Sequence, residues 1–336
     1  MELVACLERE LGRLLPAEGG TAIGPPAHHA LLPAGKLLRP LLVVRSALAV
    51  GGVVERVVPA AVGLECAHAG SLVHDDLIDR DAFRRGRAAV HERFGMGAAI
   101  VTGNALFFIW FEALAECASR GVPNARIVAA ARVQARAGRE VCEGAARELA
   151  QAGDLDTTVA DYLEMVRLKT AVLMSAACRI GATLAGATAP RIAALAAYGE
   201  AFGTAFQIRD DLLPYTADPH LAGKPLGSDV RNLRPTLPVL LARDRGTPIQ
   251  RSELRRAFTS RSVLQRHAIV REMIESTGAA AAAAGTAEEH ADQARAHLAR
   301  LPDSPHREFL AALIGTTTAS NFPSPLPDTS AGSTPS

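Results

Sequence analysis

The stretch from Glu65 to Gly86 limits the fold and the chemistry of this chain more than any other. It reads ECAHAGSLVHDDLIDRDAFRRG, the end of an apolar helix pattern that carries three aspartates and is followed by two arginines. At 3.6 residues per turn, Asp75, Asp76 and Asp79 share one face of that helix. Carboxylates so close together repel one another, and a hard divalent cation such as Mg²⁺ relieves the repulsion. The pattern therefore indicates either a metal site or a solvated helix end with ordinary charge pairs.

Arg84 and Arg85 follow this acidic cluster closely. Mg²⁺ keeps several of its waters and usually binds one or two carboxylates together with phosphate oxygens. Arginine side chains bind phosphate through paired hydrogen bonds. If the aspartates hold a metal, we therefore expect the remaining partner to be a phosphorylated substrate.

A second acidic pair lies far along the chain, in YGEAFGTAFQIRDDLLP. Gln207, Asp210 and Asp211 place polar groups on one stripe of another apolar helix. Two such helices can face each other across a bundle and hold a small metal cluster between them. The repetition favours a metal site over two unrelated groups of surface charges.

The composition favours helices over sheets. Hydrophobic residues make up 49 % of the 336 residues and aromatic residues only 4 %, whereas strands are enriched in β-branched and aromatic residues. No internal linker divides the chain. We expect an all-α fold with a single domain over residues 1–315, and a disordered tail over residues 316–336, which is rich in Ser, Thr and Pro.

Several classes of protein do not fit the composition. A net charge of +1 argues against a binder of nucleic acid or of acidic membranes. The five cysteines form no CxxC pair, which is typical of free thiols in a reducing cytosol. The N-terminus reads as a short amphipathic helix rather than a signal peptide, and the apolar run at 95–111 is short for a membrane span, so we expect a buried core helix there. A cytoplasmic protein without a membrane span is predicted.

Six motifs, in this order, resemble the trans-type isoprenyl diphosphate synthases, also called polyprenyl synthetases, and among them the geranylgeranyl diphosphate synthases. The resemblance covers roughly residues 35–242 and implies a single bundle of long helices around a central cavity, of the isoprenoid synthase type, and a homodimer. The motifs are GKLLRP at 35–40, HDDLIDRDAFRRG at 74–86, Tyr162 with Lys169-Thr170, AFQIRDDLL at 205–213, GKPLGSD at 223–229 and RPTLP at 234–238.

The resemblance also implies a reaction. Members of this family are Mg²⁺-dependent prenyltransferases that join isopentenyl diphosphate to an allylic diphosphate. Three Mg²⁺ ions, with Mn²⁺ as an alternative, help the allylic diphosphate to leave, and the double bond of isopentenyl diphosphate attacks the resulting cation. The implied partners of this chain are therefore these two diphosphates.

Residue roles are carried over only where this sequence matches the family motifs. Taken without the resemblance, Lys36 and Arg39 read as a surface charge pair, His68 as a core histidine and Lys169 as a lysine that extends to solvent. The matching positions are, for metal binding, Asp75, Asp76, Asp79, Asp210 and Asp211; for catalysis, these aspartates with Lys169, Thr170 and Gln207; and for substrate binding, Lys36, Arg39, His68, Arg84, Arg85, Lys224 and Arg234.

Three positions depart from the family pattern near the implied diphosphate sites. The family usually has Arg where this chain has Leu37, Gln where it has Ala145, and a third Asp where it has Pro214. Proline cannot ligate a metal, and we expect it to end the helix at Leu213. The departures leave room for a specialised prenyltransferase with another acceptor.

In the resembled family, the bulk of the residues just before the first aspartate pair sets the product length. Here Ser71 and Gly70 are small, which predicts a pocket that stays open beyond a C15 product. We therefore expect geranylgeranyl diphosphate (C20), or a longer product. Four aromatic residues of the next helix either close the pocket further down or belong to the core: Phe107, Phe108, Trp110 and Phe111.

Two other functions compete with this interpretation. A class I terpene cyclase would share the helical fold and the metal, but it usually carries a single aspartate motif and lacks the GKxLRP element. A non-catalytic partner subunit would tend to lose the first aspartate motif, which this chain keeps.

Overall fold

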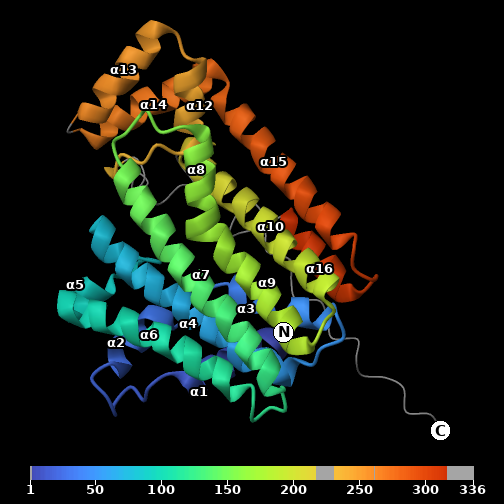
Figure 1. The fold of residues 1–336 in the computed structure, drawn as a ribbon. Coiled ribbons are helices and arrows are strands. Elements are labelled where there is room, and N and C mark those ends of the chain that lie inside the picture. The colour runs from blue at the N-terminus through green and yellow to red at the C-terminus, as the bar shows by residue number, and fades with distance from the viewer. Residues whose placement is uncertain (1, 217–230, 261, 316–336) are drawn as a thin grey trace. The chain divides into compact units, whose positions relative to one another are not determined.

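The computed structural model of the chain describes residues 2–216, 231–260 and 262–315. Within these residues the fold is built from helices and one very short pair of strands (Figure 1). This confirms the predicted all-α class. Lys224, with the whole GKPLGSD motif at 223–229, and the predicted tail lie outside the described residues.

The chain divides into two compact units. Three long helices contribute several residues to both units: α7 (Asn124–Gln151), α9 (Val172–Ala185) and α10 (Ala189–Thr216). The single-domain organisation stays a prediction. The first unit comprises Met1–Gln134, Ala177–Leu195 and Leu298–Ser336, and the second comprises Ala135–Ala176 and Ala196–His297.

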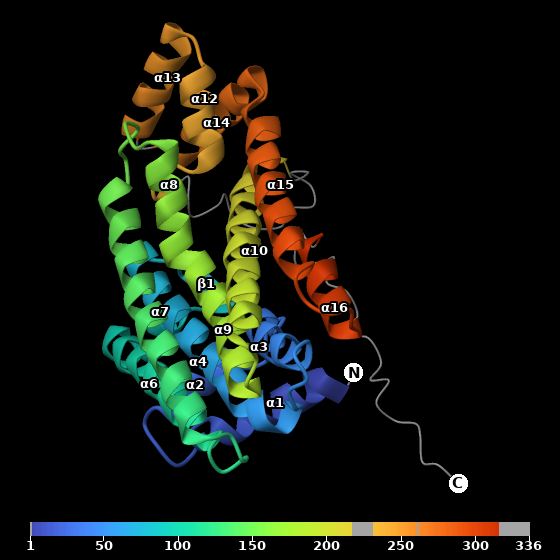
Figure 2. The same cartoon turned by 45° about the vertical axis from the view of Figure 1, so that its right-hand side comes forward.

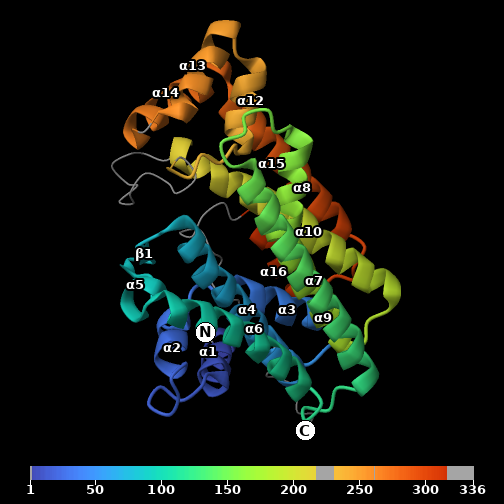
Figure 3. The same ribbon diagram turned by 60° about the vertical axis from the view of Figure 1, so that its left-hand side comes forward.

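The first unit is organised around α4, which packs along α6 and α3 (Figure 3). Glycines on α4 allow α6 to come close: a Cβ at Gly63 would lie 2.6 Å from that of Ala113, and one at Gly70 would lie 2.9 Å from the carbonyl oxygen of Gly103. The small size of Gly70 thus serves helix packing. The helices of this unit are α1 (Glu2–Leu14), α2 (Gly24–Leu31), α3 (Leu38–Leu48), α4 (Val54–Asp79), α5 (Val90–Phe94), α6 (Met96–Glu116) and α16 (Pro305–Ile314).

A short hairpin follows α4. Strand β1 (Phe83–Arg84) pairs antiparallel with β2 (Arg87–Ala88), and Arg84 lies opposite Arg87. The two turn residues, Arg85 and Gly86, have φ values of 52° and 74°. Positive φ at both central residues is the geometry of a tight type I′ hairpin turn. This hairpin was not predicted from the sequence.

The second unit begins its main helical run at Thr158, whose side chain forms a capping box with Asp161 at the start of α8. A π-helical turn, η1, separates α8 from α9, and α13 and α14 pack side by side (Figure 2). The remaining elements of this unit are α8 (Val159–Val166), η1 (Arg167–Ala171), α12 (Leu237–Arg245), α13 (Pro248–Thr259), α14 (Val263–Thr277) and α15 (Ala279–Leu298).

Two expectations about local structure are wrong. Residues 17–34 are rich in Gly, Pro and Ala, which predicts a loop, but they contain α2, whose prolines lie in the first turn, where a missing N–H costs little. Pro214 was expected to end its helix at Leu213, but α10 continues to Thr216. Because proline has no N–H, the carbonyl of Asp210 loses its usual helical donor at this point.

The helix α6 is less buried than expected. Val101, Phe108 and Phe111 are 57 %, 70 % and 43 % exposed, whereas Trp110 is 2 % exposed. By length and composition alone, Met96–Glu116 and Val159–Ala185 are apolar enough to cross a membrane, and 44 % and 67 % of an apolar 18-residue window in each are buried. Core helices pass the same test, so α6 is a half-buried helix with one exposed apolar face.

Candidate functional site

The last turns of α4 hold the first aspartate cluster, and its members differ in burial. Asp76 is 2 % exposed, and its Oδ1 accepts hydrogen bonds from Nε of Arg84, at 2.8 Å, and from Nη2 of the same side chain. Burial raises the pKa of Asp76, and Arg84 opposes the shift. Asp75 and Asp79 are only partly buried and stand one turn apart. Asp76 thus holds Arg84, while Asp75 and Asp79 lie nearer the surface.

Four more predicted substrate residues belong to this unit. Three of them, Arg39, His68 and Arg85, lie together and are called the cationic cluster below, after the charge of the two arginines. Burial and repulsion from Arg85 lower the pKa of Arg39 to about 10, and Glu65 partly offsets the shift. Nε of Arg39 is buried and has no hydrogen-bond partner within the described part of the chain. Burial, with the nearby Arg39 and Arg85, lowers the pKa of His68 well below its ordinary value, so this imidazole is neutral. Lys36 is exposed.

The side chain of Arg85 packs against Gly35. A Cβ at Gly35 would lie 2.8 Å from Nη2 of Arg85, so the guanidinium lies directly against the glycine. A concentration of positive charge with an orphaned buried donor is what an anion site requires.

Glu65 is a member of the same cluster that the sequence analysis missed. It is 5 % exposed, and burial raises its pKa, while Arg39 and Arg85 act in the opposite direction. A charged residue in the middle of an apolar helix, three positions before His68, was the available signal.

A hydrogen-bonded chain in the second unit surrounds the second aspartate pair. Asp211 is 6 % exposed and accepts hydrogen bonds of 2.7 Å from the hydroxyl of Tyr162 and from Nε2 of Gln207. Oε1 of Gln207 in turn accepts a 2.9 Å hydrogen bond from Oγ1 of Thr170. Asp210 is exposed. The arrangement directs Asp211 into the protein and leaves Asp210 at the surface.

Lys169 contacts an anionic side chain of the protein itself. Its Nζ contacts Oε2 of Glu148, which also lies 3.0 Å from Nη2 of Arg234. The three side chains are 14–18 % exposed. The π-helical turn that carries Lys169 packs so closely on α7 that a Cβ at Gly144 would lie 2.4 Å from the backbone nitrogen of Lys169. π-helical turns are frequent at functional sites. Glu148 was not predicted.

The two aspartate pairs therefore share one asymmetry. The second member of each pair, Asp76 or Asp211, is buried and bonded to protein, and the first, Asp75 or Asp210, is more exposed. Among the described residues, no three His, Cys, Asp or Glu side chains are arranged to hold a metal ion by themselves. The donor set still fits Mg²⁺, because Mg²⁺ takes few protein carboxylates and completes its shell with water and phosphate. That the two pairs face each other stays a prediction.

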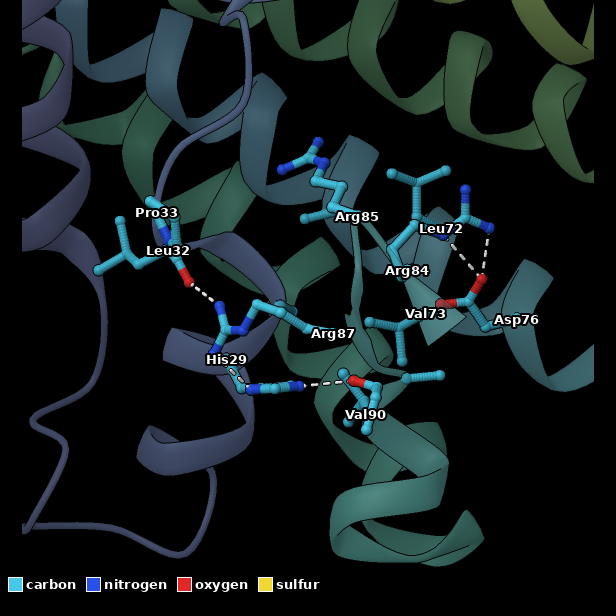
Figure 4. Close-up of a pocket in the computed structure, with 14 residues that line it drawn as sticks. His29, Leu32, Pro33, Leu72, Val73, Asp76, Arg84, Arg85, Arg87 and Val90 are labelled. Carbon is cyan, nitrogen blue, oxygen red and sulfur yellow. Dashed lines mark hydrogen bonds and ion pairs between the residues drawn. The ribbon is translucent and has the colours of Figure 1, made fainter. Parts of the chain in front are cut away.

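A cavity of about 80 Å³ lies beside the pair of Arg84 and Asp76 (Figure 4). Its lining comes from α2, α4, the hairpin and the loop at Leu32, and it includes Arg85 and Arg87. The hairpin thus forms one wall of a pocket next to the cationic cluster.

The chain was compared with known proteins. The family model for polyprenyl synthetase matches residues 21–276. A short chain isoprenyl diphosphate synthase of Methanothermobacter thermautotrophicus is 36 % identical, over 85 % of this chain and 87 % of its own length.

Solved structures agree with this similarity. Geranylgeranyl pyrophosphate synthetase of Pyrococcus horikoshii has a TM-score of 0.87 and 32 % identity, covering 93 % of this chain and 94 % of its own. A polyprenyl synthase of Caulobacter crescentus, solved with calcium and isoprenyl diphosphate, has a TM-score of 0.85 and 34 % identity, covering 95 % of both chains. Other similar proteins include synthases of farnesyl and octaprenyl diphosphate, and component 2 of a heptaprenyl diphosphate synthase.

Proposed function

The chain belongs to the polyprenyl synthetase family of prenyltransferases, and we propose that it condenses isopentenyl diphosphate with an allylic diphosphate to form a longer prenyl diphosphate. One observation carries the proposal: the first unit brings Arg39 and Arg85 to His68, which stands two helical turns before Asp75 on α4, and within the described residues Nε of Arg39 has no hydrogen-bond partner. An anion site next to a carboxylate pair suits diphosphate substrates that are handled with a metal.

The cationic cluster of the first unit is assigned to isopentenyl diphosphate. Arg39 and Arg85 are its charged donors, and Lys36 adds a flexible ammonium at the surface. His68, being neutral, contributes a hydrogen bond rather than a charge. Glu65 lies within the field of both arginines, which act against the rise that burial causes in its pKa. The family structure solved with isoprenyl diphosphate supports a diphosphate ligand.

The allylic diphosphate is assigned to the remaining cations and to the metal. Asp75, Asp79 and Asp210 would hold the metal, for which we propose three Mg²⁺ ions, replaceable by Mn²⁺. A bound divalent ion stabilises the negative charge of the departing diphosphate. The side chains that we propose to bind this diphosphate are Arg84, Lys169, Lys224 and Arg234. Glu148 must then yield Lys169 and Arg234 to the substrate or share them with it.

Asp76 and Asp211 receive a different role from the one first assigned. Both were predicted metal ligands, but each is buried and bonded to other side chains. We propose that Asp76 orients Arg84 and that Asp211 orients Gln207. Gln207 and Thr170 then present polar groups toward the allylic cation.

We still propose a product of C20 or longer, but the argument now depends on Ser71 and no longer on Gly70. Gly70 packs against α6 and therefore does not line an open pocket floor. Ser71 stays small, with its hydroxyl bonded to the carbonyl oxygen of His68 at 2.8 Å. Phe107, which packs near Gly70 and against the ring of His74, is the aromatic residue placed to limit length. The similar proteins make products from farnesyl to octaprenyl diphosphate, so length depends on such local residues.

A homodimer in the cytoplasm completes the proposal. Val101, Phe108 and Phe111 recur at the spacing of one helical stripe on α6 and are exposed. A second copy of this chain, bringing the same stripe, would bury it.

A product assay tests the proposed function. Purified protein with Mg²⁺ is given isopentenyl diphosphate and dimethylallyl, geranyl or farnesyl diphosphate, and the products are dephosphorylated and sized. We expect a C20 product that is lost with EDTA and in Asp75→Ala. A longer product keeps the reaction and rejects C20. A cyclic hydrocarbon would indicate a terpene cyclase, and no elongation of any primer contradicts the proposal.

A second candidate keeps the fold and changes the acceptor. Pro214 stands where the family has a third aspartate, so the metal site near Asp210 has fewer carboxylates than usual. With another acceptor added to the same assay, transfer of the prenyl group to that acceptor would appear as release of diphosphate without growth of the prenyl chain.

A further inference from the structure

His29 joins three elements of the first unit. Its Nδ1 lies 2.7 Å from Nη2 of Arg87, on the hairpin, and 3.0 Å from Nη1 of Arg93, on α5. Its Nε2 lies 2.7 Å from the carbonyl oxygen of Ala88. The ring also meets the ring of Phe94 edge-on, at 5.5 Å between centroids. A side chain of α2 thus holds the second strand of the hairpin and the helix that follows it.

The partners of His29 define which nitrogen carries its proton. Arginine only donates hydrogen bonds, so Nδ1 accepts from Arg87 and Arg93. A carbonyl oxygen only accepts, so Nε2 carries the hydrogen that Ala88 receives. The geometry requires a neutral imidazole with its hydrogen on Nε2. Nδ1 is then the acceptor and Nε2 the donor.

Arg87 has a second attachment, because its Nη1 donates to the carbonyl oxygen of Leu32 (Figure 4). Directly across the hairpin, Arg84 is tied to Asp76 on α4. The two paired strand residues are therefore each bound to a different helix or loop of the same unit, and the turn residue Arg85 lies between them.

Arg85 has a backbone that needs such support. Its φ of 52° lies in the left-handed region, which costs a residue with a side chain about 1 kcal/mol or more. The guanidinium lies against Gly35, on the way to Arg39 and His68. A small rotation of the hairpin would move this group away from the cationic cluster.

We propose that His29 and Arg87 are positioning residues that hold Arg85 in the isopentenyl diphosphate site. The inference rests on the proposed function and deepens it, since the partners of His29 and Arg87 are Ala88, Arg93 and Leu32, none of which is assigned to the substrate. Arg84 and Asp76 anchor the first strand, and Arg87 and His29 anchor the second. The tip of the hairpin between these anchors presents Arg85 to the anion.

The test measures the binding of isopentenyl diphosphate by calorimetry, without an allylic primer and therefore without turnover. We expect His29→Leu to raise the Kd about fivefold, the usual effect of one lost hydrogen bond. His29→Gln offers an acceptor and a donor at similar positions and is expected to stay within about twofold. In turnover assays, His29→Leu is expected to raise KM for isopentenyl diphosphate while kcat and KM for the allylic substrate stay unchanged.

An Arg85→Ala background separates positioning from general damage. If His29 acts through Arg85, adding His29→Leu to Arg85→Ala changes the Kd no further. His28→Leu is the matched control, because His28 lies on the same helix and contacts the carbonyl oxygen of Pro16, at 3.0 Å, instead of the hairpin. It is expected to bind as the wild type does.

Three results overturn the inference. They are an unchanged Kd in His29→Leu, an additional loss when it is combined with Arg85→Ala, and an equal rise in KM for both substrates. A wild-type protein that binds no isopentenyl diphosphate overturns the proposed function as well. Wild-type binding with an unaffected His29→Leu variant overturns only the role of His29.

Discussion

The hydroxyl of Tyr162 donates a 2.7 Å hydrogen bond to Oδ2 of Asp211, deep in the second unit. Both residues are almost fully buried, at 1 % and 6 % exposed. The carboxylate next to it in sequence, Asp210, is at the surface. One aspartate of the pair therefore supports the structure around Gln207, and the other, at the surface, is the one that we propose as a metal ligand.

The second aspartate pair, Asp210 and Asp211, predicts two different mutant phenotypes, one in stability and one in turnover. Asp211→Asn weakens buried hydrogen bonds and is expected to cost about 1–3 kcal/mol of unfolding free energy. Asp210→Asn is expected to leave stability unchanged and to lower kcat roughly a hundredfold, because about 3 kcal/mol of metal-mediated stabilisation is lost. Urea unfolding and steady-state kinetics of the two variants measure these effects. Equal losses of stability, or of kcat, in the two variants would show that structural support and metal binding are not divided between Asp211 and Asp210.

Gly35→Ala is expected to affect substrate binding without affecting the fold. The new methyl group would lie within 3.0 Å of the guanidinium of Arg85, which can swing away because it ends a flexible side chain. Gly35 does not adopt a positive φ, so alanine brings no backbone strain. KM for isopentenyl diphosphate should rise about tenfold, as expected for one charge-assisted hydrogen bond.

The unfolding free energy of Gly35→Ala should stay within about 0.5 kcal/mol of the wild type. Gly12→Ala is the control, since a Cβ at Gly12 meets nothing within 4 Å. An unchanged KM in Gly35→Ala would place Arg85 outside the binding site.

His68 predicts a particular pH dependence of stability. Its pKa is lowered in the folded protein by burial and by the neighbouring arginines. Below an ordinary pKa of about 6.5, the unfolded chain binds a proton at His68 that the folded protein does not, so stability falls as pH falls. His68→Asn removes this contribution, worth at most about 1.4 kcal/mol per pH unit.

The measurement compares unfolding free energies of the wild type and His68→Asn between pH 5 and 8. The difference between the two should change with pH below about 6.5 and be constant above about 7.5. Parallel curves over the whole range would mean that His68 takes up a proton as readily when folded as when unfolded.

Phe108→Glu tests the proposed homodimer. Phe108 is 70 % exposed at the centre of the apolar stripe on α6. A buried, unpaired charge at a subunit interface is strongly unfavourable, so the dimer dissociation constant should rise at least roughly tenfold. Sedimentation equilibrium measures it. Ile249→Glu, which changes a residue 71 % exposed on α13, is the control and should remain dimeric. A monomeric wild type, or a Phe108→Glu variant with an unchanged dissociation constant, contradicts the proposal.

The helical fold and the positions of both aspartate pairs were predictable, because apolar periodicity and acidic clusters are local patterns. The difference between Asp75 and Asp76 was not. Helical spacing places both on one face, but burial depends on Arg84, which folds back from a hairpin of two-residue strands that are too short to show an alternating pattern.

Other misses have equally specific reasons. The prolines before His28 suggested a loop, although proline is tolerated in the first turn of a helix. Glu148 gave no signal, because a single glutamate on a charged helix is ordinary. Its importance comes from Lys169 and Arg234, which lie far from it in sequence.

The π-helical turn at Arg167–Ala171 has a consequence for the tolerance of the chain to insertions and deletions. Eight regular helical steps would leave Tyr162 and Thr170 about 80° apart, yet both bond to the pair Gln207 and Asp211 on α10. A wider turn absorbs one extra residue, about 100° of rotation, and so brings the two side chains onto one face. Deleting one residue within this turn would restore a regular α-helix with that face intact. The same deletion between Tyr162 and Val166 would not, unless the wide turn itself closed up to compensate.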